Sequence, residues 1–129
     1  MPHSFPIRVY YEDTDMGGIV YYANYLKFIE RARSDWVRQM GIDQNAMRDE
    51  EGLVFAVRRV GADYLSSAHF DDELTVLTET RNVSGARLVL EQLVYRGDTL
   101  LFSAEVTVVC ISETGQPARL PANLRLILH

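Results

Sequence analysis

Apolar side chains recur at three- and four-residue steps from position 22 to position 40, which is the spacing of one face of an α-helix. The members of this face are Tyr22, Tyr25, Leu26, Ile29, Ala32, Trp36, Val37 and Met40. Charged residues fall mostly between them, and Gly41 is the residue type that most often follows a helix C-terminus. The pattern predicts one long, largely buried helix over about residues 23–40.

Alternating apolar and polar residues, typical of half-buried strands, lie on both sides of this helix. A first strand is expected from Phe5 to Tyr11. Four more are predicted at residues 53–65, 74–83, 87–95 and 100–111, the first of these bent at Gly61. Short connections favour antiparallel neighbours. The order of elements predicts an α+β fold, with the helix across one face of an antiparallel sheet, in a single domain of residues 1–129.

Two shorter helices are also expected. One occupies about residues 42–51, where a polar connection is the alternative and Asp43 has the residue type of an N-terminal cap. The other is a short helix in the tail, from Pro121 to Leu128.

Composition excludes several classes of function. With 129 residues and a net charge of -5, the chain does not have the basic character of a general nucleic-acid binder. No apolar run is long enough to span a bilayer and the N-terminus has no signal-peptide core, so we expect a cytoplasmic protein without membrane insertion. Three scattered histidines and one cysteine, Cys110, do not have the spacing of a metal site.

The candidate chemistry lies just before the long helix. Glu12, Asp13 and Asp15 precede the pair Gly17-Gly18, close to where the helix is expected to begin. A helix N-terminus offers N–H groups without internal partners, so a carboxylate there is suited to attack on a carbonyl group. Ordinary turn chemistry explains the same cluster of Asp and Gly. Alternation does not choose the acid, because Asp13 and Asp15 share a face if the strand continues.

The same stretch carries a family resemblance. Residues 15–25, with residues 30–33 downstream, resemble the signature of 4-hydroxybenzoyl-CoA thioesterase-type hot-dog proteins. The longer string that begins at Tyr10 is closer still to the Tol-Pal-associated acyl-CoA thioesterase branch. Segments 55–59, 71–72 and 105–110 also fit that branch.

The resemblance implies a hot-dog fold, in which an antiparallel sheet wraps a long central helix. It implies homodimers or homotetramers with active sites at the dimer interface, and hydrolysis of acyl-CoA to a free acid and CoA without a metal or redox cofactor. Asp15 aligns with the catalytic nucleophile or general base, the backbone N–H of Tyr22 with the donor to the thioester carbonyl, and Gly18 with the motif glycine. Enterobacterial members carry His at the position of Tyr22, a change that leaves a backbone donor in place.

A second group of residues is a candidate for holding the CoA phosphates from a neighbouring subunit. It consists of Arg58, Arg59, Arg81 and Arg87 with the turn Ser84-Gly85. Solvated strand ends are the alternative interpretation for each arginine. Glu30 is a candidate for orienting active-site groups, although a surface role is the simpler interpretation.

Two other functions compete with thioester hydrolysis. A hot-dog dehydratase or hydratase normally pairs an acid with a histidine, and no histidine lies between Phe5 and Tyr64. A non-catalytic acyl-binding or partner-binding module is the other alternative, with acyl carrier protein or the Tol-Pal envelope system as its partner. Asp15 and the paired glycines favour catalysis. The sequence leaves open the acyl chain length, the thioester donor and the choice between dimer and tetramer.

Overall fold

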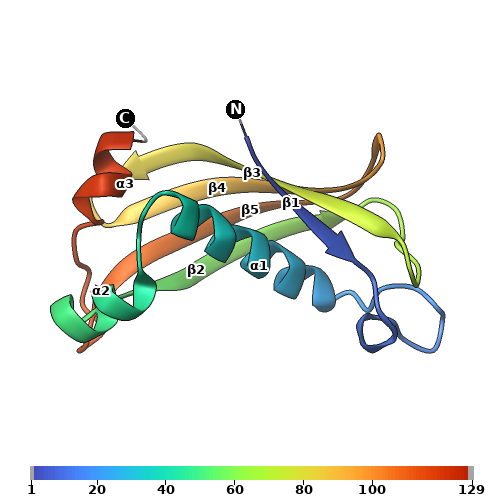
Figure 1. The fold of residues 1–129 in the computed structure, drawn as a ribbon, viewed down its shortest axis with the longest axis horizontal. Coiled ribbons are helices and arrows are strands. Elements are labelled where there is room, and N and C mark those ends of the chain that lie inside the picture. Colours follow the sequence, from blue (N-terminus) through green and yellow to red (C-terminus); the bar gives the residue numbers. More distant parts are fainter. Residues whose placement is uncertain (1, 128–129) are drawn as a thin grey trace.

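The computed structural model describes residues 2–127, whose elements follow the predicted order (Figure 1). The strands are β1 (His3–Arg8), β2 (Leu53–Tyr64), β3 (Glu73–Ser84), β4 (Arg87–Arg96) and β5 (Thr99–Ser112). The helices are α1 (Asn24–Gln39), α2 (Gln44–Glu51) and α3 (Ala122–Ile127), with a short 3-10 helix η1 (Tyr11–Asp13) between β1 and α1. No helix within residues 2–127 has the length and apolar content needed to cross a bilayer.

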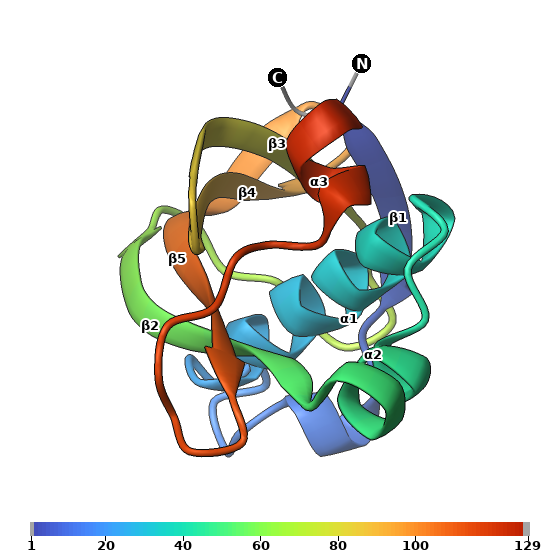
Figure 2. The same ribbon diagram turned by 90° about the vertical axis from the view of Figure 1, so that its left-hand side faces the viewer.

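The strands of the described residues form one antiparallel sheet in the order β1-β3-β4-β5-β2. Figure 2 shows this sheet curling around α1, with β1 and β2 at its two edges. The α+β prediction, with a helix across one sheet face, is therefore confirmed. Because β2 has a partner on one side alone, its outer backbone groups face away from the sheet.

Helix α1 fills the concave side of the sheet with its apolar face. Phe28 and Ala32 are completely buried, and the ring of Tyr25 stacks on that of Phe102 from β5, with ring centroids 4.8 Å apart. Two members of the predicted face are exposed instead of buried. Tyr22 precedes the helix and so does not share its face, and Leu26 lies at the flank of the buried stripe.

The first strand is shorter than predicted. It ends at Arg8, not Tyr11, because the carboxylate of Asp13 accepts a hydrogen bond from the backbone N–H of Tyr10 at 2.8 Å and turns the chain into η1. The bend expected at Gly61 is also wrong. Gly61 pairs regularly with Glu105, and the irregularity of the β2–β5 ladder lies earlier, between Val57 and Arg59.

Both short helices are confirmed. The carboxylate of Asp43 accepts hydrogen bonds from the N–H groups of Asn45 and Ala46, which caps α2 as predicted. Helix α3 covers Ala122–Ile127, and the expected end at Leu128 lies outside the described residues.

Candidate active site

Asp15 lies on a tight turn between β1 and α1. Its backbone N–H donates to the carbonyl of Ile19 at 3.0 Å, and its own carbonyl accepts from the N–H of Gly18 at 3.0 Å. The N–H of Gly17 donates to the carboxylate Oδ1 of Asp15 at 2.8 Å. Gly18 has a φ of 77°, a left-handed conformation that favours glycine. The turn therefore holds an exposed carboxylate in a fixed orientation.

Asp13 occupies a different environment, although it is two residues away. Its side chain is buried at 5% exposure and accepts the N–H of Tyr10. Its carbonyl accepts from the N–H of Tyr21 at 2.9 Å and from Nδ2 of Asn24, also at 2.9 Å. Asp13 thus ties the loop to the first residue of α1. The predicted strand does not continue here, so the two aspartates do not share a face.

The N–H of Tyr22 is the donor that the resemblance implies. Tyr22 is not inside the helix, since α1 begins at Asn24 and Ala23 is its N-terminal cap. The N–H of Asn24 donates to the carbonyl of Tyr21 at 2.8 Å. No acceptor within residues 2–127 takes the N–H of Tyr22. A backbone donor therefore remains free beside the positive end of the α1 dipole.

Asp15 and Tyr22 line the same hollow, of about 340 Å³. Its other walls are largely apolar and aromatic, and they include Ile19, Tyr21, Tyr25, Tyr64 and Leu65. The hydroxyl of Tyr64, at the end of β2, donates to the carbonyl of Tyr22 at 2.9 Å. The structure thus brings together the predicted acid and the predicted donor. Gly18 supports the turn that carries Asp15, without being part of the lining.

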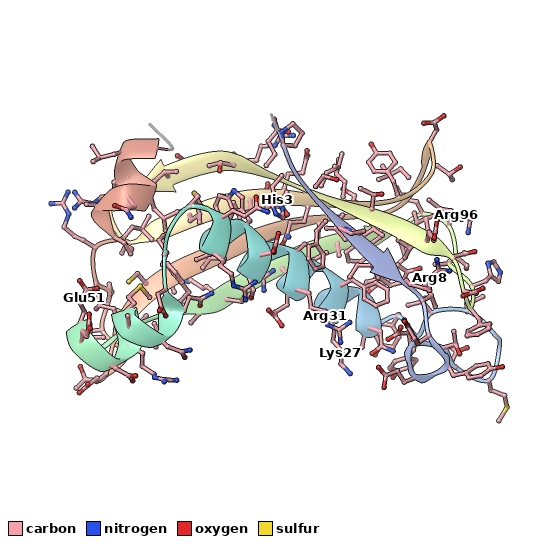
Figure 3. All side chains as sticks on the ribbon, in the orientation of Figure 1. His3, Arg8, Lys27, Arg31, Glu51 and Arg96 are labelled. Atoms are coloured by element: carbon pink, nitrogen blue, oxygen red, sulfur yellow. The ribbon has the colours of Figure 1, made fainter. Side chains whose placement is uncertain are left out.

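The loop after β2 closes one side of this hollow with Ser66 and Ser67, and Arg96 anchors that loop. Nη1 of Arg96 donates to the carbonyl of Ser67 and to the carboxylate of Asp72, both at 3.0 Å. Figure 3 shows Arg96 at the same end of the molecule as Arg8, where β1 leads into the Asp15 turn. The anchor keeps the loop against the site.

The anchor also changes the titration of Asp72. Burial would raise the pKa of this carboxyl group, but hydrogen bonds from the N–H of His69 and from Arg96, together with the charge of Arg96, outweigh it. The pKa of Asp72 is therefore lower than its ordinary value, and the carboxylate stays charged beside Arg96.

The predicted CoA-binding residues gather elsewhere. Arg58, Ser84, Gly85 and Arg87 line a second hollow of about 500 Å³, whereas Arg59 does not line it. Arg59 follows the ladder irregularity at Val57, which breaks the simple alternation of side chains along β2. The β3–β4 turn of this hollow lies at the opposite end of the sheet from the Asp15 loop (Figure 1). One chain alone therefore does not bring these residues to Asp15.

Arg81 and Glu30 are not part of either hollow. Arg81 forms an ion pair with Glu91 on the neighbouring strand. Glu30 accepts a hydrogen bond from the hydroxyl of Ser34 and lines a separate cavity of about 260 Å³ between α1 and the sheet, together with Arg33. Among the described residues, no three His, Cys, Asp or Glu side chains gather closely enough to hold a metal ion.

Sequence reasoning missed two residues that hold the site together, Tyr64 and Asn24. Asn24 carries a usable signal, because Asn is favoured where a helix begins and bonds nearby backbone groups there. Tyr64 carries none, since its partner Tyr22 lies 42 positions earlier in the chain. Such a contact depends on how β2 and the loop before α1 meet in the fold.

Acyl transfer to water requires two groups, a carboxylate and a free N–H donor. Here an exposed carboxylate and a free N–H donor share one hollow. The donor can polarise a carbonyl oxygen, and the carboxylate can attack its carbon or activate water. The apolar walls suit the hydrocarbon part of an acyl group. The fold and the site therefore have the features expected of an α+β protein that transfers acyl groups.

Comparison with known proteins places the chain in a family. Residues 9–128 match the model of the thioesterase-like superfamily. The chain is 41% identical over 128 residues to the acyl-CoA thioesterase YbgC of Haemophilus influenzae, covering 98% of this chain and 93% of that one. It is also 41% identical over 122 residues to the acyl-CoA thioester hydrolase YbgC of Escherichia coli, covering 93% and 90%.

A solved structure agrees with these relatives. The crystal structure of a probable thioesterase from Bartonella henselae superposes with a TM-score of 0.90 at 39% identity, covering 94% of this chain and 100% of that one. This chain belongs to the thioesterase-like superfamily. The hot-dog fold and the family resemblance predicted from residues 15–25 are both confirmed.

Proposed function

We propose that this protein hydrolyses acyl-CoA thioesters to a free acid and CoA. The observation that carries the proposal is the shared hollow of Asp15 and Tyr22, which joins an exposed carboxylate to a free N–H donor. Relatives that are 41% identical over most of the chain are named for the same reaction, which supports the choice of substrate class.

In the proposed mechanism, the acyl carbonyl oxygen faces the N–H of Tyr22. Asp15 either attacks the carbonyl carbon or removes a proton from an attacking water molecule. Negative charge then develops on the oxygen, where the N–H and the start of α1 stabilise it; one such donor typically contributes about 3 kcal/mol to the transition state. The C–S bond breaks, and the thiolate leaves with little need for a general acid. If Asp15 attacked, water then hydrolyses the acyl–Asp15 anhydride to the free acid and restores the carboxylate; if water attacked, the free acid forms directly and the proton held by Asp15 passes to the thiolate or to solvent.

We further propose that the active form is at least a homodimer joined through β2. This edge strand is 12 residues long and exposes Val57 and Val60, which is unfavourable for a free edge. Two copies of β2 paired antiparallel about a two-fold axis place the start of one strand beside the end of the other. That pairing carries the hollow of Arg58 and Arg87 toward the Asp15 hollow of the second copy, where arginines suit CoA phosphates.

The experiment that tests the proposed function is thiol release by the purified chain. The substrates are short aliphatic, long aliphatic and aromatic acyl-CoA thioesters, with the best acyl group also presented on acyl carrier protein. We expect turnover of at least one CoA thioester, and the panel then identifies the acyl class and the donor. A folded chain that releases no thiol from any substrate contradicts the proposal and favours a non-catalytic acyl-binding module.

A further inference from the structure

Tyr64 makes a hydrogen bond that links the end of β2 to the loop before α1. Its hydroxyl donates to the backbone carbonyl of Tyr22 at 2.9 Å, across 42 residues of sequence. Tyr64 is the last residue of edge strand β2, and 49% of its surface is exposed. The acceptor belongs to the residue whose N–H faces the reacting carbonyl in the proposed mechanism.

The ring of Tyr64 is held by its neighbours. Its centroid lies 5.0 Å from that of Phe102 and 5.7 Å from that of Tyr25, both in edge-on contacts. Phe102 and Tyr25 are buried and stack on each other. The hydroxyl therefore extends from a rigid aromatic base, and its position does not depend on a mobile side chain.

The backbone around Tyr22 has few other restraints. Its own N–H has no acceptor among residues 2–127, and its side chain is 62% exposed. The hydrogen bonds that fix this segment involve its neighbours, through the N–H of Tyr21 to Asp13 and the N–H of Asn24 to Tyr21. The bond from Tyr64 acts directly on Tyr22.

We propose that Tyr64 is a positioning residue, whose hydroxyl fixes the backbone of Tyr22 and thereby aims the Tyr22 N–H at the reacting carbonyl oxygen. This inference rests on the proposed function. The donor works in the transition state only if it points at the developing oxyanion before the reaction begins. Loss of the Tyr64 hydroxyl leaves the Tyr22 N–H in place but makes its orientation less fixed. The loss should therefore affect the chemical step more than substrate binding.

The hydroxyl keeps its proton under ordinary conditions. Burial, followed by the effect of neighbouring Tyr22, raises the pKa of Tyr64 above its usual value. Tyr64 therefore stays a donor throughout the pH range in which a thioesterase would be assayed.

The test is Tyr64→Phe, which removes the hydroxyl and keeps the ring against Phe102. We expect kcat to fall about tenfold, less than the 100-fold or more expected when an oxyanion donor is lost outright. KM and the dissociation constant of a non-hydrolysable acyl-thioether analogue should change less than about twofold. Tyr95→Phe, the same change on β4 outside the hollow, is the control and should retain wild-type kcat.

Two kinetic results overturn the inference: an unchanged kcat for Tyr64→Phe, or a raised KM with kcat preserved. If the wild type turns over no substrate, the proposed function fails instead. The backbone amide signal of Tyr22 in NMR then decides the positioning separately. Broadening or doubling of that signal in Tyr64→Phe, absent in Tyr95→Phe, supports it, and an unchanged signal overturns it.

Discussion

At the scale of single residues, the two aspartates before α1 differ in what surrounds them. Asp13 is buried, and its carboxylate and carbonyl both hold neighbouring backbone, whereas Asp15 is exposed on a turn and lines the hollow. A carboxylate that holds the fold together cannot at the same time approach a substrate. Burial therefore gives Asp13 a structural part, whereas Asp15 is exposed and lines the hollow.

The paired glycines next to Asp15 should respond differently to alanine. A Cβ at Gly17 would meet Oδ1 of Asp15 at 3.2 Å, so Gly17→Ala should displace the carboxylate and lower kcat. At Gly18 nothing lies within 4 Å, but φ is 77°, so Gly18→Ala should cost about 1 kcal/mol of stability through backbone strain. Steady-state kinetics of both variants measure the change in kcat, and urea unfolding measures the change in stability. Equal effects of the two changes on kcat would contradict it.

The sequence predicts those parts of the site that depend on neighbouring residues in the chain, and not those that depend on distant ones. The Asp15 turn is set by a few adjacent residues, so a motif is enough to place it, whereas the backbone of Tyr22 also accepts a hydrogen bond from Tyr64, 42 positions later. The choice between Asp13 and Asp15 is not local. It depends on the burial of the Asp13 side chain, which requires α1 to pack against the loop, where Asn24 bonds the carbonyl of Asp13.

At the scale of elements, α1 is predicted almost to the residue because its apolar face repeats over four turns and is buried along its length. The end of β1 is not predicted, since one side-chain bond, from the N–H of Tyr10 to Asp13, overrides the alternating pattern. The loop between β2 and β3 contains no periodic pattern. Arg96 holds this loop beside the site, and it lies on β4, which comes later in the sequence than the loop.

The Arg96 anchor predicts a pH-dependent part of the stability. The pKa of Asp72 is lowered in the folded protein, so this contribution is present above the ordinary carboxyl value of 3.8 and is lost as pH falls through the lowered value. Arg96→Met should therefore cost about 1 kcal/mol in unfolding free energy at pH 6 and less at pH 3. Urea unfolding at both pH values measures the difference.

The control for that experiment is Arg31→Met. Arg31 projects from the exposed side of α1 (Figure 3) and forms no ion pair with a described residue. Arg31→Met should lower the unfolding free energy only slightly, and by nearly the same amount at both pH values. If Arg96→Met shows the same pH dependence as Arg31→Met, Asp72 is not the group that Arg96 stabilises.

At the scale of the whole molecule, the two hollows of one chain lie at opposite ends of the sheet. The sequence predicts the arginines of the second hollow by residue type, and the structure gathers Arg58 and Arg87 there but neither Arg59 nor Arg81. No single-chain pattern predicts how that hollow reaches a bound CoA, because the answer depends on a second copy. Edge strand β2, with exposed apolar side chains, is the surface through which the two copies would meet.

A charge on this edge should separate the copies. Val60→Lys places an ammonium group on β2 at a position that is 38% exposed in the single chain and buried in the proposed dimer. We expect a smaller mass in light scattering and a loss of activity at dilute concentration, with the fold retained by circular dichroism. The control is Thr75→Lys, on β3, which leaves the β2 edge unchanged. A Val60→Lys protein with wild-type mass contradicts pairing through β2.

The most direct test of the central claim compares Asp15→Asn with Asp13→Asn on the best acyl-CoA substrate. The amide keeps the shape of each side chain and removes its charge. Asp15→Asn should lower kcat by about 100-fold or more, which is the loss expected when a catalytic acid–base group is removed. Its unfolding free energy should be unchanged. Asp13→Asn should lose about 1–3 kcal/mol of stability through its buried bond to Tyr10 and retain more activity. Greater loss of kcat in a folded Asp13→Asn protein would contradict the assignment of Asp15.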